Sequence, residues 1–231
     1  MVSIDTVYQR VLAFANKEQR GYITPQEFNL FANQAQMEIF EQYFYDLNQF
    51  GRLPGNDTEY SDMLSLLNEK VSVLEVRLIN QVVTNGIFNI QNLNPILYKL
   101  GSVIFNGAEV EGVNNNEYHY MRSSPLTQPN TSRPVYVNRI DGLNIYPQTI
   151  SSIDISYIKR PDDARWGYVV VNEKAMYDPT PTKTTDFELH QAEETELIYK
   201  ILKFAGIAIQ KEDIMRAGQG LEIAKAQQEK Q

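Results

Sequence analysis

The stretch NKEQRGYITPQEF, which begins at residue 16, has the residue types and spacing that come closest to a chemical motif. On the twelve-position pattern of an EF-hand calcium loop, Gly21 falls on the sharp turn and Glu27 on the final bidentate carboxylate. Arg20, however, stands at an early ligand position, where a fixed positive charge opposes a dication. A calcium-binding module built on residues 16–27 is therefore an alternative function and not the leading one.

The same residues also fit a turn between two helices. Thr24 and Glu27 have the T-x-x-E spacing of a capping box, and Pro25 suits the first position of a helix. Gly21 then ends the preceding helix as its C′ residue. We expect this turn in place of a calcium loop.

Other carboxylates and the two histidines offer weaker candidates for acid–base chemistry. Asp162 and Asp163 follow Pro161, which predicts a turn, and a hydrolase that uses either of them is a further alternative. Glu193, Glu194 and Glu196 lie in the expected first turn of a helix, where carboxylates favour the helix dipole. His119 lies in EYHYM, which we interpret as a strand, and His190 is far from it in sequence.

Composition excludes several classes of function. The chain has 231 residues, a formal charge of −8 and no cysteine, so disulfides, thiolate metal sites and cysteine nucleophiles are absent. Its basic residues are scattered, which argues against a protein that grips nucleic acid through clustered cations. Phosphate-cradling glycine loops and serine-hydrolase or zinc-protease motifs are missing, so we predict no enzyme, no cofactor and no bound metal. We also expect neither a signal peptide nor a membrane span, and hence a soluble intracellular protein.

The elements that must position these residues are helical at both ends of the chain. Apolar spacing predicts helices from about residue 3 to 17, from 25 to 50 and from about 60 onward, where leucine and valine recur at intervals of three and four. The second helix is apolar over more of its circumference than one core stripe requires, which indicates two neighbours. A further helix is predicted from Gln191 to about Ala205, ending at Gly206, and a polar one from Glu212 to the end.

The middle of the chain is predicted to be β-structure. Short runs such as PVYVNRI and SIDISYIK are separated by prolines and by turn pairs, Asn85–Gly86, Asn106–Gly107 and Asp141–Gly142. We predict an α+β fold in which helical N- and C-terminal segments pack together around an inserted, mostly antiparallel β lobe. The expected parts are 1–80 (helical), 81–185 (β lobe) and 186–231 (helical).

Two segments look like loops or arms, since residues 123–134 and 177–185 are polar and interrupted by prolines. The C-terminal helix has few large apolar groups, so it is either a solvated tail or a segment that is ordered only against something else. Loops of this kind either serve a partner or are merely mobile, and the sequence does not decide between these readings.

Three stretches resemble a known family: ANKEQRGYITPQEFNLFANQAQMEIFEQYF near the start, LNIYPQTISSIDISYIKRPDDARW in the middle, and FELHQAEETELIYKILKFAGIAI near the end. They are similar to the ring and head–tail connector proteins in the tail and neck of crAss-like bacteriophages. In architecture alone the chain also resembles the tail tubular proteins of short-tailed phages.

The resemblance implies a non-catalytic virion protein, assembled in the cytoplasm of a bacterial host. It implies a ring of identical subunits, with twelve copies suspected, as an adaptor at the portal–tail junction. The partners implied are the portal protein, neighbouring tail ring proteins and genomic DNA that passes without sequence-specific binding. An acidic channel suits that passage, because it offers few cationic contacts to phosphates.

A cyclic ring needs two unlike faces that complement each other. From the apolar second helix, the proline-rich segment and the lone tryptophan, which we expect to anchor the β lobe or an interface, we predict these interface residues: Phe31, Phe40, Tyr43, Phe44, Leu126, Pro129, Pro134 and Trp166.

Overall fold

The chain forms two compact units, which are described separately. The structure is a computed structural model that describes residues 1–17, 23–50, 58–91 and 93–208. One unit comprises Met1–Val73 and Pro161–Gln231, and the other comprises Leu74–Arg160. Helices at both ends and mostly antiparallel sheets between them make this an α+β fold, which confirms the predicted class.

The boundaries between the units differ from the predicted ones at 80/81 and 185/186. The first falls at 73/74, since helix α3 (Thr58–Ser72) ends there and strand β1 (Glu75–Val82) follows at once. The leucines and valines that recur from about residue 60 onward therefore do not all lie on one helix: Leu67 and Val71 lie on α3, but Leu74 and Leu78 do not. The second falls at 160/161, because residues 161–185 pack and hydrogen-bond within the helical unit.

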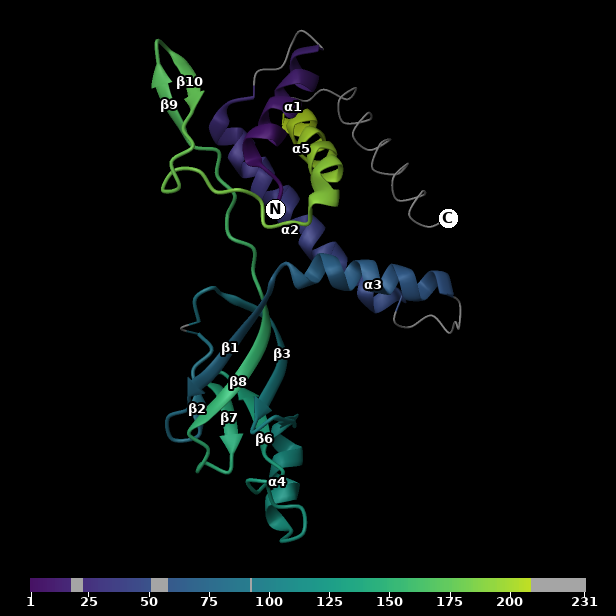
Figure 1. The fold of residues 1–231 in the computed structure, drawn as a ribbon, viewed down its shortest axis with the longest axis vertical. Coiled ribbons are helices and arrows are strands. Elements are labelled where there is room, and N and C mark those ends of the chain that lie inside the picture. Colours follow the sequence, from purple (N-terminus) through teal and green to yellow (C-terminus); the bar gives the residue numbers. More distant parts are fainter. Residues whose placement is uncertain (18–22, 51–57, 92, 209–231) are drawn as a thin grey trace. The chain divides into compact units, whose positions relative to one another are not determined.

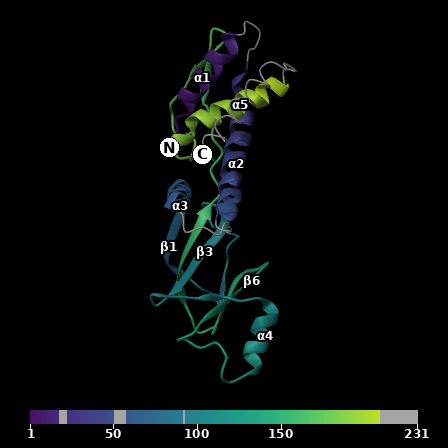
Figure 2. The same ribbon diagram turned by 90° about the vertical axis from the view of Figure 1, so that its right-hand side faces the viewer.

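The helical unit is built on α1 (Ile4–Lys17), α2 (Pro25–Phe50), α3 and α5 (Glu194–Ala208), the last preceded by the short 3-10 helix η1 (Gln191–Glu193). Helix α5 lies against α1 and α2 (Figure 2). The core between them is mainly apolar, with Val7, Val11, Phe28, Ile39 and Ile201 all buried. Helix α2 contacts both α5 and α3, which accounts for its apolar character on two sides.

Helix α1 is capped from a distant part of the chain, and α5 ends later than predicted. The first N–H group of α1, that of Ile4, donates to Oδ1 of Asp186 at 2.9 Å, so a distant residue caps this helix and not a neighbouring side chain. Helix α5 runs through Gly206 to Ala208 in place of ending at the glycine. The polar helix predicted from residue 212 lies outside the described residues.

The other unit contains two four-stranded sheets. The first has the order β1, β8 (Ser152–Lys159), β3 (Leu97–Phe105) and β4 (Ala108–Glu109). The second has the order β2 (Ile87–Phe88), β7 (Gly142–Tyr146), β6 (Val135–Arg139) and β5 (Glu111–Gly112). All pairings are antiparallel except β5 with β6.

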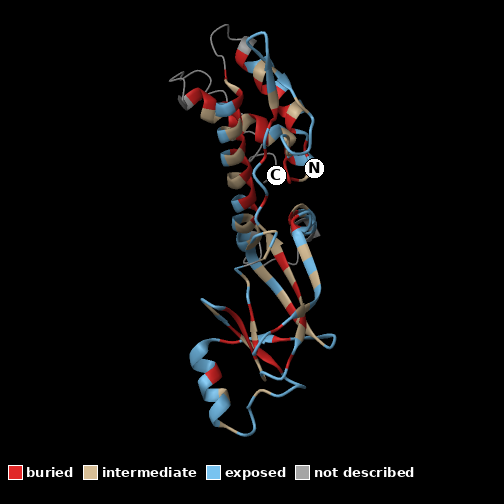
Figure 3. Ribbon diagram, turned by 90° about the vertical axis from the view of Figure 1, so that its left-hand side faces the viewer, coloured by how far each residue is buried: buried red, intermediate tan, exposed pale blue. Residues whose placement is uncertain are grey.

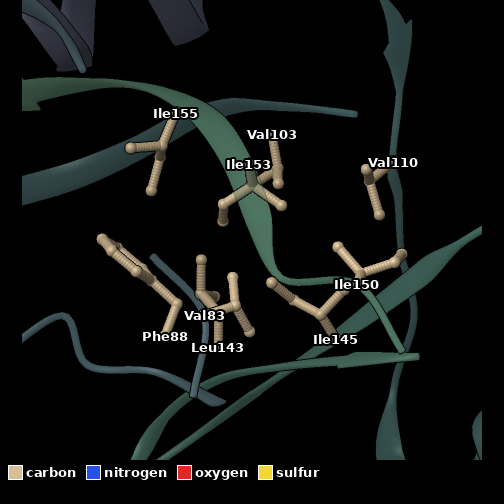
Figure 4. Close-up of a cluster of buried hydrophobic side chains, with 9 residues drawn as sticks. All are labelled: Val83, Phe88, Val103, Val110, Leu143, Ile145, Ile150, Ile153 and Ile155. Atoms are coloured by element: carbon tan, nitrogen blue, oxygen red, sulfur yellow. The ribbon is translucent and has the colours of Figure 1, made fainter. Parts of the chain in front are cut away.

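The core of this unit lies between the two sheets. Side chains from both sheets and their connections point toward one another (Figure 4), namely Val83, Phe88, Val103, Val110, Leu143, Ile145, Ile150, Ile153 and Ile155. Strand β8 alternates buried and half-buried residues, as a strand with one face on the core must.

The predicted turns are present. Asn85–Gly86 and Asn106–Gly107 have positive φ at both residues, which suits tight hairpin connections. Gly142 has φ +129, and a Cβ there would lie 2.2 Å from the carbonyl oxygen of Phe88, so only glycine fits.

The prediction that EYHYM forms a strand is wrong. These residues belong to helix α4 (Asn115–Ser123), which is mostly exposed, with Tyr118 buried (Figure 3). The N–H of Asn114 donates to Oε2 of Glu117 at 3.4 Å, and this capping contact starts a helix where aromatic content suggested β-structure.

The helical unit also carries a small hairpin of β9 (Tyr168–Val171) and β10 (Lys174–Tyr177), drawn in green in Figure 1. Strand β10 was not predicted. None of the described helices is both long and apolar enough to cross a membrane.

Candidate assembly surface

The motif that resembled a calcium loop forms a helix cap in its described part. The N–H of Thr24 donates to Oε2 of Glu27 at 3.0 Å, and the N–H of Glu27 donates back to Oγ1 of Thr24 at 3.3 Å. The hydroxyl of Thr24 adds a bond of 2.7 Å to the same carboxylate, and these bonds lower the pKa of Glu27. The predicted capping box is confirmed, and α2 begins at Pro25. Residues 18–22, with Arg20 and Gly21, lie outside the described part of the chain.

The backbone of Asp162 forms two hydrogen bonds with glutamine and glutamate side chains. Its N–H donates to Oε2 of Glu188 at 2.9 Å, and its carbonyl accepts from Nε2 of Gln36 at 2.8 Å. Gln36 is buried, and its Oε1 accepts from the N–H of Glu188 at 3.2 Å. Together these bonds fix the extended segment after Pro161 to α2. Asp163 is exposed.

The three glutamates before and within α5 each form an ion pair with a lysine or an arginine. Glu193 is buried and lies 2.6 Å from Nζ of Lys70, which joins η1 to α3. Glu194 lies 2.8 Å from Arg10 on α1. Glu196 lies 3.7 Å from the buried Nζ of Lys200, which is equally far from Glu38 on α2. Glu193 and Glu194 therefore join helices, and Lys200 joins α5 to α2.

The two histidines belong to different units. His190 caps η1, because its Nδ1 accepts from the N–H of Ala192 at 3.2 Å. His119 lies on exposed α4 in the other unit. Within the described ranges, no three His, Cys, Asp or Glu side chains come together as metal ligands would.

The residues predicted to form an interface have different environments. Phe40, Tyr43, Pro134 and Trp166 are buried within the chain itself, so their apolar character requires no second subunit. The half-buried members are Phe31, Phe44 and Pro129, whereas Leu126 is 91 % exposed. A role for residues 123–134 as an arm between subunits stays a prediction.

Trp166 is an internal anchor of the helical unit and does not belong to the β lobe. Its ring packs on Tyr8 with centroids 4.1 Å apart, and its Nε1 donates to Oδ1 of Asp5 at 2.9 Å. Its backbone N–H donates to Oδ1 of Asn29 at 2.8 Å. The segment that leads into the hairpin is thereby fixed to α1 and α2.

The base of the hairpin rests on this tryptophan. Tyr168 and Tyr177, which are paired across the two strands, both stack near Trp166, with ring centroids 5.9 and 5.8 Å from it. Burial raises the pKa of the Tyr177 phenol, with further contributions from nearby carboxylates. The hairpin therefore leaves the unit from a rigid aromatic base.

Beyond the base, the hairpin exposes apolar side chains on both faces. It stands apart from α1 and α5 of the same unit (Figure 1). Neighbouring residues of a strand point to opposite faces, yet consecutive positions of β9 are exposed. The exposed apolar side chains beyond the base are Val169, Val170, Val171 and Met176, and Tyr177 in the base is itself 37 % exposed.

The turn of the hairpin, Asn172–Glu173, has positive φ at both residues without a glycine. Because glutamate is uncommon in that conformation, the sequence lacked the usual turn signal. The run of three valines before Asn172 is the one sign of a strand that the sequence offers here.

The loop after the hairpin is organised by Asp178. Its carboxylate accepts from Nζ of Lys183 at 2.6 Å and from the N–H of Thr180 at 3.1 Å, and its pKa falls to about 2 for this reason. The loop in 177–185 is thus a compact turn that returns the chain to the bridge between Arg165 and Thr185.

A second apolar surface of the helical unit lies between α1 and α5. Here Ala13, Phe14, Ile198 and Tyr199 line a groove of about 450 Å³. Arg10, paired with Glu194, also lines it. Phe14 is largely exposed.

In comparison with known proteins, the sequence matches no family model and no curated protein sequence.

Proposed function

We propose that this chain is a structural subunit that assembles with copies of itself through the β9–β10 hairpin. In this proposal it forms a ring, as an adaptor at the portal–tail junction of a bacteriophage virion. The observation that carries the proposal is the exposure of five large apolar side chains on four-residue strands. Isolated two-stranded hairpins are marginally stable in water, and grouped apolar exposure is typical of surfaces that bind a partner.

The rigid base of the hairpin supports a docking role. Stacking on Trp166 orders the two tyrosines before any partner arrives, so less conformational entropy is lost on association. A merely mobile loop would not need this anchor.

A ring also requires a different surface to receive the hairpin. Head-to-tail assembly uses two unlike patches on each subunit, and it closes when the rotation between neighbours allows it. The groove between α1 and α5 supplies an apolar patch of different shape from the hairpin, and it lies on the same unit. We assign the groove as the receiving surface.

The placement at the portal–tail junction rests on the sequence resemblance. From this resemblance we propose that the partners are the portal protein, neighbouring tail rings and DNA in transit, and that the ring has twelve copies. The charge of −8 is compatible with a channel wall that does not retain DNA.

Sedimentation velocity of the full chain, alone and with the portal protein of the same phage, tests this function. The wild-type protein should sediment as an oligomer in at least one condition. Val170→Lys should shift it to the monomer, because a charge on the apolar hairpin would be buried at the interface. The matched control is Ile140→Lys, at a 91 % exposed position in the other unit, which should leave the oligomer intact. A wild-type monomer in both conditions would refute the proposal.

A further inference from the structure

The β-containing unit has a pocket with basic and amide side chains, which lies beside α4. It has a volume of about 430 Å³. Helix α4 contributes His119 and Arg122, β6 contributes Arg139, and Gln128 and Gln148 come from loops. Tyr146 and Pro147 form an apolar part of its wall.

Among the residues that the structure describes, the two arginines of this pocket have no carboxylate partner. Arg139 donates from Nη2 to the neutral Oδ1 of Asn115 at 2.8 Å, which orients the guanidinium and leaves its charge uncompensated. Neither Arg122 nor Arg139 forms an ion pair within the described residues. The nearest acidic residue in sequence, Asp141, accepts from Nδ2 of Asn144 at 3.1 Å.

Charge is unevenly divided between the two units. Between residues 74 and 160 there are six acidic and seven basic side chains, a net charge of +1. Since the whole chain has a net charge of −8, the residues outside this range have a net charge of −9. Although the whole chain is acidic, the net charge of residues 74–160 is slightly positive and does not repel an anion.

The aromatic wall is rigid. The rings of Tyr118 and Tyr146 stack with centroids 4.0 Å apart and an interplanar angle of 19°. Since Tyr118 belongs to α4 and Tyr146 to β7, this stack fixes the helix to the sheet. It thereby holds Arg122 near Arg139 without a bound partner.

We propose that this pocket binds a phosphate group. Two guanidinium groups offer paired N–H donors that match phosphate oxygens, and the glutamine amides supply neutral donors beside them. The phosphate can be free or part of a nucleic-acid backbone. In the second case Tyr146 and Pro147 offer a surface for the adjoining sugar or base. This site goes beyond the proposed ring assembly and lies in the other unit.

Two binding measurements on the full chain test the proposal. Calorimetry follows inorganic phosphate, and fluorescence anisotropy follows labelled single- and double-stranded DNA at about 50 mM salt, where phosphate contacts are strong. We expect at least one of these probes to bind. The double variant Arg122→Gln/Arg139→Gln should weaken that binding by about tenfold or more.

Arg77→Gln is the matched control. It removes one positive charge from the same unit at an exposed ion pair of 3.9 Å with Asp154, outside the pocket, and should change the affinity by less than about twofold. Circular dichroism melting of all variants checks that the fold is kept.

The outcomes of these binding measurements identify the ligand or contradict the proposal. Binding of phosphate alone identifies a free anion as the ligand, whereas binding of DNA that phosphate displaces identifies the backbone. If neither probe binds, or if binding persists unchanged in the double variant, the proposal is wrong. The sedimentation result is independent of this one, since the hairpin and the pocket are on different units.

Discussion

The indole Nε1 of Trp166 donates a hydrogen bond of 2.9 Å to Oδ1 of Asp5, two residues that are 161 positions apart in the chain. The tryptophan is only 2 % exposed, so its N–H group has no access to bulk water as a replacement partner. The same ring supports Tyr168 and Tyr177. One contact between α1 and the later segment therefore holds the base of the exposed hairpin.

Asp5→Ala should destabilise the helical unit by about 1–3 kcal/mol, because it leaves a buried donor unpaired. Chemical denaturation followed by tryptophan fluorescence measures this directly, since the chain has one tryptophan. Asp163→Ala, at an exposed position in the same unit, is the control and should change little. Equal stability of the two variants would contradict the role of Asp5.

Ile145→Ala should destabilise the β-containing unit by about 2–5 kcal/mol, the usual cost of a large cavity in a packed core. Ile145 is fully buried between the sheets, whereas nearby Ile140 is 91 % exposed. Ile140→Ala makes the same chemical change and should leave the free energy of unfolding nearly unchanged. Denaturation followed by circular dichroism compares the two, and a similar loss in both would show that the core is placed wrongly.

Gln36→Leu should cost about 1–3 kcal/mol, because the carbonyl of Asp162 and the N–H of Glu188 would both lose their buried partner. Gln34→Leu, two residues earlier on the exposed side of α2, is the matched variant. Hydrogen exchange of the Glu188 amide offers a second measurement. Its protection should fall in the first variant only.

The Asp178 carboxyl should titrate at about pH 2, well below the ordinary value of 3.8. Since the folded state favours the carboxylate, its contribution to stability is complete above about pH 3.8 and is lost as the pH falls through about 2. Carbon-detected NMR of the side-chain carboxyl follows this titration. Lys183→Met should raise the pKa, because it removes the largest cause of the lowering. Lys174→Met, on exposed β10, should not.

Local signals in the sequence were enough for much of the fold. The Asn-Gly pairs predicted hairpin turns, and φ is indeed positive at both residues of each pair. Thr24 with Glu27 predicted the start of α2. Aromatic residues misled the prediction at His119, where the contact between Asn114 and Glu117 starts a helix instead. Local capping outweighed strand propensity there.

The candidate surfaces were harder to predict because they depend on contacts between distant residues. Trp166 looked like an interface residue, but its partners Asp5, Tyr8 and Asn29 come from two other helices. The exposed hairpin was missed because its turn has no glycine. The basic pocket requires α4 and β6 to meet, and a net charge counted over the whole chain conceals it.

Electron cryo-microscopy of the assembled particle tests the central claim most directly. We predict a closed ring in which Val170 of each subunit is covered by the α1–α5 groove of its neighbour. A ring in which every β9–β10 hairpin faces solvent, or a preparation with the portal protein in which this chain stays a single copy, would contradict it.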